Sequence, residues 1–184
     1  MEEGILSIEP YAFYSYKGLT SVELPDSVMS IGEGAFMYCE SLTSIKLPGS
    51  LTGIEANTFE GCSSLASVEL LDNVKSIGEK AFAGCISLTD IAFHGSLTSI
   101  GASAFEGCMS LTVLKIPEGV TSIDYWTFSG CSGLTDIYIP GSVTSIAEYI
   151  FVFDLCTALE TIHCPAGSYA ETYARENNIT YITE

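Results

Sequence analysis

Positive charge is scarce in this sequence. Its 184 residues include 6 Lys and Arg against 23 Asp and Glu, which gives a formal net charge of −17 at pH 7. So few cations cannot neutralise a run of phosphates, and the composition therefore argues against a nucleic-acid-binding protein. It also argues against docking on an anionic membrane surface, whereas it permits a cationic partner.

Long apolar runs are missing as well. The longest purely apolar stretches, such as 149–153, are far too short to cross a bilayer. The acidic start, Met-Glu-Glu-Gly, is not followed by an apolar segment, so no signal peptide is evident. Two explanations stay open: a cytosolic parent protein, or a segment of a longer, processed chain. Apolar residues nevertheless make up 47% of the sequence, which favours a folded core over disorder.

What the sequence does contain is a repeat of 23 residues. Three residue types recur at this interval: Phe13, Phe36, Phe59, Phe82, Phe105, Phe128 and Phe151; Leu19, Leu42, Leu65, Leu88, Leu111 and Leu134; and Cys39, Cys62, Cys85, Cys108 and Cys131. The shared frame reads F-x-x-C-x-x-L-x-x-I-x-L-P-x-x-V-x-x-I-x-x-x-A. Because one unit cannot bury its own apolar side chains, the period predicts a solenoid of stacked coils.

Each unit contains two segments with strand-like alternation, typified by 42–47 and 143–146. Proline closes the first segment in most units, since it lacks the N–H that a sheet requires. The stretch Ala-Phe-x-Gly-Cys is too short for a helix and predicts a single helical or 3₁₀ turn. Equivalent strands are expected to pair in parallel at roughly 4.8 Å.

The two ends depart from this frame. Residues 5–8 match the second half of a unit, so the chain enters mid-coil, and we expect the natural protein to continue N-terminally. Such an uncapped coil exposes strand edges that favour end-to-end pairing. In the last coil a two-residue insertion leaves Phe151 and Phe153 as alternatives for the core position.

The C-terminal segment has the pattern of a cap. Ser168 and Glu171 form a capping box, and apolar residues then recur at helical spacing. The stretch 179–182 reads as a final short strand. The expected organisation is a leucine-rich-repeat solenoid over 1–166 and a C-terminal cap over 167–184.

This frame resembles the BspA-like (Treponema pallidum type) leucine-rich repeat family, whose pattern is close to L-x-x-I-x-I-P-x-x-V-x-x-I-G-x-x-A-F-x-x-C-x-x. The resemblance extends from Ile5 to Pro165. It implies an α/β leucine-rich-repeat solenoid of about seven 23-residue coils. Parallel short strands would line its concave face, with short helical turns opposite and a helix-strand cap at the C-terminus. It further implies a surface or secreted protein without catalytic residues or cofactors, which binds host or neighbouring-cell proteins.

The cysteines and histidines give no pattern of a catalytic or metal site. The cysteines occupy repeat positions without any C-x-x-C pair, so they are interpreted as small buried apolar side chains rather than ligands or disulfides. His94 and His163 occupy different repeat positions several coils apart, which makes a shared metal improbable. No nucleotide-binding or nucleophile motif occurs. We therefore predict no enzyme activity, no metal and no cofactor.

The remaining candidate is a binding face on the longer strand. Its third and fifth positions point away from the core. Core positions barely vary between coils, whereas the fifth position changes charge, size and aromaticity, as a recognition surface would and as any solvated face could. The protein-binding candidates are Glu23, Lys46, Glu69, Asp90, Lys115, Asp136, Tyr138 and His163. Of these, Lys115, Asp136, Tyr138 and His163 form the most distinctive patch, since tyrosine is a frequent interface anchor.

The hypothesis from sequence is a non-catalytic protein-binding module of a bacterial surface or secreted protein. Its partner would be a host extracellular-matrix protein or another bacterial surface protein, with neither nucleic acid nor membrane insertion involved. Two alternatives stay open. One is a passive stalk or spacer that presents another domain, and the other is an intracellular scaffold, favoured by free thiols and the missing signal.

Overall fold

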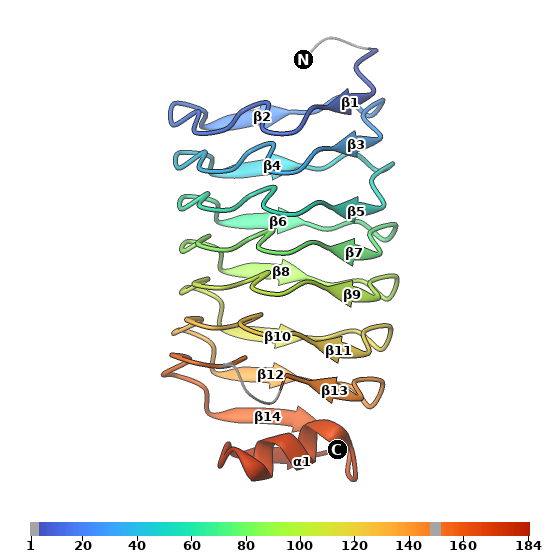
Figure 1. Ribbon diagram of the computed structural model, residues 1–184, viewed down its shortest axis with the longest axis vertical. Helices are drawn as coiled ribbons and strands as arrows, with labels where there is room; N and C mark the ends of the chain where they lie inside the picture. Colours follow the sequence, from blue (N-terminus) through green and yellow to red (C-terminus); the bar gives the residue numbers. More distant parts are fainter. Residues whose placement is uncertain (1–3, 148–151) are drawn as a thin grey trace.

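The computed structural model describes residues 4–147 and 152–184, which form one continuous stack of coils (Figure 1). There are about eight turns of roughly 23 residues, one more than the sequence predicts. Most coils contribute one three-residue strand and one two-residue strand. The longer strands are β2 (Ser21–Glu23), β4 (Ser44–Lys46), β6 (Ser67–Glu69), β8 (Asp90–Ala92), β10 (Val113–Lys115), β12 (Asp136–Tyr138) and β14 (Thr161–Cys164). The shorter strands are β1 (Ser7–Ile8), β3 (Ser30–Ile31), β5 (Gly53–Ile54), β7 (Ser76–Ile77), β9 (Ser99–Ile100), β11 (Ser122–Ile123) and β13 (Ser145–Ile146).

Equivalent strands pair in parallel, as the repeat predicts. The longer strands form sheets in the order β2-β4-β6-β8 and β10-β12-β14, and the C-terminal strand β15 (Tyr181–Thr183) extends the second of these. The shorter strands form separate sheets beside them. In Figure 1 the arrows of the two kinds of strand point in opposite directions, because the chain turns back at a corner between them. Ser21 faces Ser44 and Ser44 faces Ser67, so every repeat position lies on its own equivalent in the next coil.

The segments around each phenylalanine are hydrogen-bonded turns rather than helical turns. The residues two positions before and two positions after the phenylalanine have positive φ, for example Tyr11 (57°) and Ser15 (55°) around Phe13. Their amides point to the following coil: the Phe13 N–H donates to the Ala35 carbonyl at 2.8 Å, and Tyr11 and Ser15 donate in the same direction. A helical turn would direct these amides along its own chain, so the left-handed residues join successive coils instead.

The core is a column of stacked phenylalanine rings. Neighbouring rings lie between 5.1 Å (Phe13 to Phe36) and 5.9 Å (Phe105 to Phe128) apart. The column ends at Phe153, whose ring is 5.8 Å from that of Phe128 and almost parallel to it. Phe153 therefore takes the core position in the last coil, while the alternative, Phe151, lies outside the described residues.

The C-terminal helix and strand cover the last coil. Helix α1 (Tyr169–Glu176) starts at Ser168, whose hydroxyl accepts a hydrogen bond from the Glu171 N–H. Its inward side chain Tyr173 packs edge-on against Phe153. Strand β15 (Tyr181–Thr183) then adds to β14 in parallel. Within the described parts of the chain, no helix has the length and apolar character that a membrane span requires.

Candidate functional site

The strand face, defined as the outward side chains of the longer strands, contains all eight candidate residues. The longer strands after β2 bury the residue between their outward side chains, as in β4, where Ser44 and Lys46 are exposed around buried Ile45, whereas Val22 of β2 is only partly buried. The candidates on this face are Glu23, Lys46, Glu69, Asp90, Lys115, Asp136, Tyr138 and His163. The structure brings the last four into contact. Among the described residues, Glu23, Lys46, Glu69 and Asp90 make no hydrogen bond, ion pair or ring contact with them.

Three of these side chains form a column along the strand face. The Lys115 ammonium lies 4.9 Å from the centre of the Tyr138 ring. The Tyr138 ring in turn stacks on the His163 imidazole, with 4.1 Å between centroids and 10° between planes. The column exists because strand pairing places Lys115 opposite Tyr138 and Tyr138 opposite His163. We call these three residues the aromatic column.

Acidic groups fix the imidazole at the end of the column. The Nε2 atom of His163 is 3.0 Å from a carboxylate oxygen of Asp136, and its Nδ1 atom is 3.8 Å from a Glu184 oxygen. The hydrogen bond from His163, helped by one from Thr135, lowers the pKa of the Asp136 carboxyl. Nδ1 is buried and makes no hydrogen bond. The His163 side chain is only 12% exposed, so the ring is held in one orientation.

A small groove of about 280 Å³ runs beside the aromatic column. Its lining residues are Lys115, Ile116, Glu118, Tyr138, Ile139, Pro140, His163, Cys164, Pro165 and Glu184. Small-molecule pockets usually measure roughly 300–1,000 Å³, so this groove is better matched to one side chain of a partner. Its apolar floor and charged rim are typical of a protein interface.

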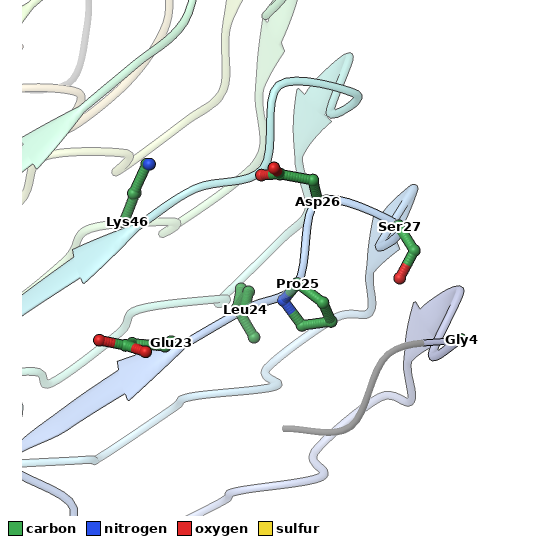
Figure 2. A pocket seen from close by; sticks show the side chains of 7 residues that line it. All are labelled: Gly4, Glu23, Leu24, Pro25, Asp26, Ser27 and Lys46. Atoms are coloured by element: carbon green, nitrogen blue, oxygen red, sulfur yellow. The ribbon is translucent and has the colours of Figure 1, made fainter.

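A second hollow, of about 730 Å³, lies at the other end of the strand face. Figure 2 shows Glu23 and Lys46 on neighbouring strands and Asp26 beyond Pro25. Glu23 and Lys46 face each other in the sheet register. The hollow is open and its charges are mixed, so it offers no convergent set of groups for a small ligand or for chemistry.

The seven cysteines are free and buried, in keeping with the interpretation of them as small apolar side chains. Each thiol of the ladder donates to the phenylalanine carbonyl of the preceding coil, as Cys62 does to Phe36 at 3.1 Å. Burial raises the pKa of Cys62 to about 12 and that of Cys156 to about 11. These thiols therefore stay protonated and are poor nucleophiles and poor metal ligands. The described residues contain no cluster of three or more potential metal ligands.

One set of surface residues is not indicated by the sequence pattern. Tyr11 and Tyr38 are in left-handed turn positions, and each ring lies over a glycine of the next coil, Gly34 and Gly61 respectively. The only sequence signal is a tyrosine followed, one coil later, by Glu-Gly. That signal becomes meaningful only when the coils are known to stack in register.

The comparisons with known proteins agree with this architecture. The family model of the BspA type leucine rich repeat region matches residues 1–94 and 54–182, with six copies. A leucine-rich repeat protein from Bacteroides ovatus ATCC 8483 is 34% identical over 87% of this chain and 43% of its own, with a TM-score of 0.82. The T. pallidum leucine rich repeat protein TpLRR is 28% identical over 99% of this chain and 82% of its own, with a TM-score of 0.79.

A third similar structure is a leucine rich cell surface protein from Faecalibacterium prausnitzii A2-165. It is 33% identical over the whole of this chain and 56% of its own, with a TM-score of 0.69. No curated protein sequence is significantly similar. The chain spans less than two thirds of the B. ovatus and F. prausnitzii proteins. With its repeat frame, its stacked coils and the family match over nearly its whole length, the chain belongs to the BspA-type leucine-rich repeat family.

Proposed function

We propose that this BspA-type repeat, a fold of protein-interaction modules, acts without catalysis as an adhesive module on a bacterial surface. Its partner is a host extracellular-matrix protein or a surface protein of a neighbouring bacterium, and the strand face is its binding surface. The observation that carries this proposal is the aromatic column of Lys115, Tyr138 and His163 beside a groove of side-chain size.

The aromatic column suits binding because it is held in place before a partner arrives. Tyr138 lies between the Lys115 ammonium and the His163 ring, and His163 is fixed by Asp136. Ordering a flexible side chain at an interface costs about 0.5–1.5 kcal/mol, and a pre-ordered one avoids most of that cost. Tyrosine is also among the residues that most often dominate interface energies.

The surface location is supported by the F. prausnitzii relative, which is called a cell surface protein. Free thiols, taken alone, favour an intracellular scaffold instead. Their burial and raised pKa weaken that argument, because a protonated, inaccessible thiol resists oxidation outside the cell as well. A surface role and a thiol ladder are therefore compatible.

The test is a binding assay on the purified chain. The chain is immobilised and exposed to purified extracellular-matrix proteins and to surface extract from neighbouring bacteria. The variant Tyr138→Ala/His163→Ala should lose affinity by at least about thirtyfold, the loss expected for an interface hot spot. Tyr125→Ala, which removes a 47% exposed tyrosine away from the strand face, is the matched control and should bind normally.

If Tyr138→Ala/His163→Ala still binds saturably with unchanged affinity, the binding site lies elsewhere than on the aromatic column of the strand face. No saturable binding to either pool would favour a passive spacer. Thermal melts of all three proteins must show intact folding, so that a loss of binding reports contacts rather than unfolding.

A further inference from the structure

A second surface with distinctive chemistry lies on the turn side of the first coils, away from the strand face. It consists of Tyr11, Tyr14 and Tyr38, which we call the tyrosine platform. The Tyr14 ring meets both of the others edge-on, at 6.2 Å from Tyr11 and 5.9 Å from Tyr38. Tyr11 is 47% exposed and Tyr14 is 52% exposed, whereas Tyr38 is partly buried.

Two glycines form the floor of the platform. A Cβ atom added at Gly34 would collide with the Tyr11 ring, and one added at Gly61 would collide with the Tyr38 ring. One face of each ring therefore packs on backbone. Because the floor supports that face, the rings of Tyr11 and Tyr38 are held in fixed positions.

The hydroxyl ends of the same rings are tied to carboxylates. Tyr11 donates a hydrogen bond to Glu33 at 2.6 Å, and Tyr38 donates one to Glu60 at 2.9 Å. Asn57 also donates to Glu33, at 3.4 Å. These hydrogen bonds raise the pKa of both phenols, so they stay neutral donors at physiological pH. An ionised carboxylate has about four acceptor sites, so Glu33 and Glu60 keep capacity for another donor.

The platform borders an open hollow of about 830 Å³ lined by Tyr11, Tyr14, Met37, Asn57, Glu60 and Lys80. Electron-rich ring faces beside carboxylates, on a chain of net charge −17, are complementary to a cation. Lys80 is the single cation among the lining residues and opposes this attraction only in part.

We propose that the tyrosine platform binds an arginine-containing basic segment of a partner protein. Guanidinium groups stack on the solvent-exposed parts of the Tyr11 and Tyr38 rings and donate hydrogen bonds to Glu33 and Glu60. Arginine suits this surface better than lysine because its guanidinium is planar, stacks on aromatic rings and donates in a fork that matches a carboxylate. This surface is separate from the strand face and acts independently of it.

The test uses a fluorescein-labelled hexa-arginine peptide, whose anisotropy is followed as the full chain is added at 150 mM NaCl. The variant Tyr11→Ala/Tyr38→Ala should weaken binding by about five- to thirtyfold, from two cation–π contacts at a partly exposed site. Neither substitution changes the net charge. Non-specific attraction between a polyanion and a polycation therefore predicts no effect, and equal affinity in this variant would overturn the proposal.

Tyr125→Ala is the matched control, because it removes an equally exposed tyrosine on distant turns. Its affinity should equal that of the parent chain, as should the affinity of Tyr138→Ala/His163→Ala. Lys80→Gln should bind the peptide more tightly. A loss in Tyr125→Ala as large as in the platform variant would also overturn the proposal.

A carboxylate pair provides a second test if Tyr38→Ala disturbs folding. Glu33→Gln/Glu60→Gln keeps acceptors for the tyrosine hydroxyls but removes two charges beside the rings. Glu160→Gln/Glu176→Gln removes two exposed charges elsewhere and is the charge-matched control. The first pair should weaken binding several-fold more than the second. Equal losses of peptide affinity in the two pairs would overturn the proposal. It would also be overturned if the tyrosine platform bound neutral oligosaccharides and did not bind the peptide.

Discussion

The imidazole of His163 stacks on the phenol of Tyr138 with 4.1 Å between the ring centres. The two residues are direct register partners in β12 and β14, although the insertion before Phe153 adds two residues to the coil between them. The extra length is therefore absorbed before β14 begins, and the strand face continues without interruption to the C-terminal cap. The aromatic column on the surface and the phenylalanine column in the core arise in the same way, because each residue packs on the residue at the same repeat position in the next coil.

Stability should depend on the central rings of the core column. Phe82 is fully buried and lies between the rings of Phe59 and Phe105. Phe82→Ala should lower the free energy of unfolding by about 3–5 kcal/mol, because it removes buried area and leaves a cavity. Urea denaturation measures this. Tyr125→Ala, a truncation of an exposed ring, should cost less than about 0.5 kcal/mol, and equal costs would contradict the role assigned to the column.

The thiol ladder should be inert in the folded protein. All seven cysteines are buried, and burial raises the pKa of Cys62 to about 12. Because the thiolate is the reactive species, the native chain should react only slowly with Ellman's reagent at pH 8. In urea all seven should react at the rate of model thiols. Rapid native reaction of several thiols would show that the coils open, or that the ladder is not packed as described.

The hydrogen bond from His163 gives Asp136 a measurable effect on acid stability. The pKa of Asp136 is lower in the folded chain than in the unfolded chain, where it is about 3.9. The stabilisation that the ionised carboxyl contributes is therefore fully present above the unfolded pKa and is lost as the pH falls through the folded pKa. Between pH 6 and pH 3 the parent chain should therefore lose more stability than Asp136→Asn does. Urea midpoints at the two pH values give the comparison. Asp26→Asn serves as the control and should match the parent.

Substitutions at Gly61 and Gly84, which occupy the same repeat position, distinguish the stability cost of backbone strain from the cost of displacing a ring. Gly61 and Gly84 have φ of 70° and 72°, so alanine at either position is strained, by about 1 kcal/mol. A Cβ at Gly61 additionally meets the Tyr38 ring, whereas one at Gly84 is 3.6 Å from its nearest neighbour. Gly61→Ala should therefore cost more stability than Gly84→Ala. Thermal and urea unfolding decide this, and equal costs would mean that the Tyr38 ring moves freely.

The repeat made most of the fold predictable. The apolar ladder at 23 residues gives the stacking, the parallel register and the strand positions, as for 42–47, which contains β4. The aromatic column could also be predicted from the sequence, because Lys115, Tyr138 and His163 occupy the same strand position in successive coils. What the sequence could not show was the left-handed turns. Tyr11, Asn57, Lys80 and Trp126 occupy a positive-φ position, and their side chains share no property that signals this conformation.

The turns give their own side of the stack an electrical direction, whereas amides beside the shorter strands, such as that of Gly32 to the Ile8 carbonyl, donate in the opposite sense. At Phe13, Phe36, Phe59, Phe82 and Phe105 the amide of one coil donates to the carbonyl of the next, always in the same sense. Peptide dipoles in a sheet largely cancel, but dipoles aligned head to tail add up along their axis, as they do in an α-helix, and leave partial charges at the two ends. The turn side is therefore polarised along the axis, with its negative end at the first coil. Lengthening such a rod moves the two end charges apart without enlarging them.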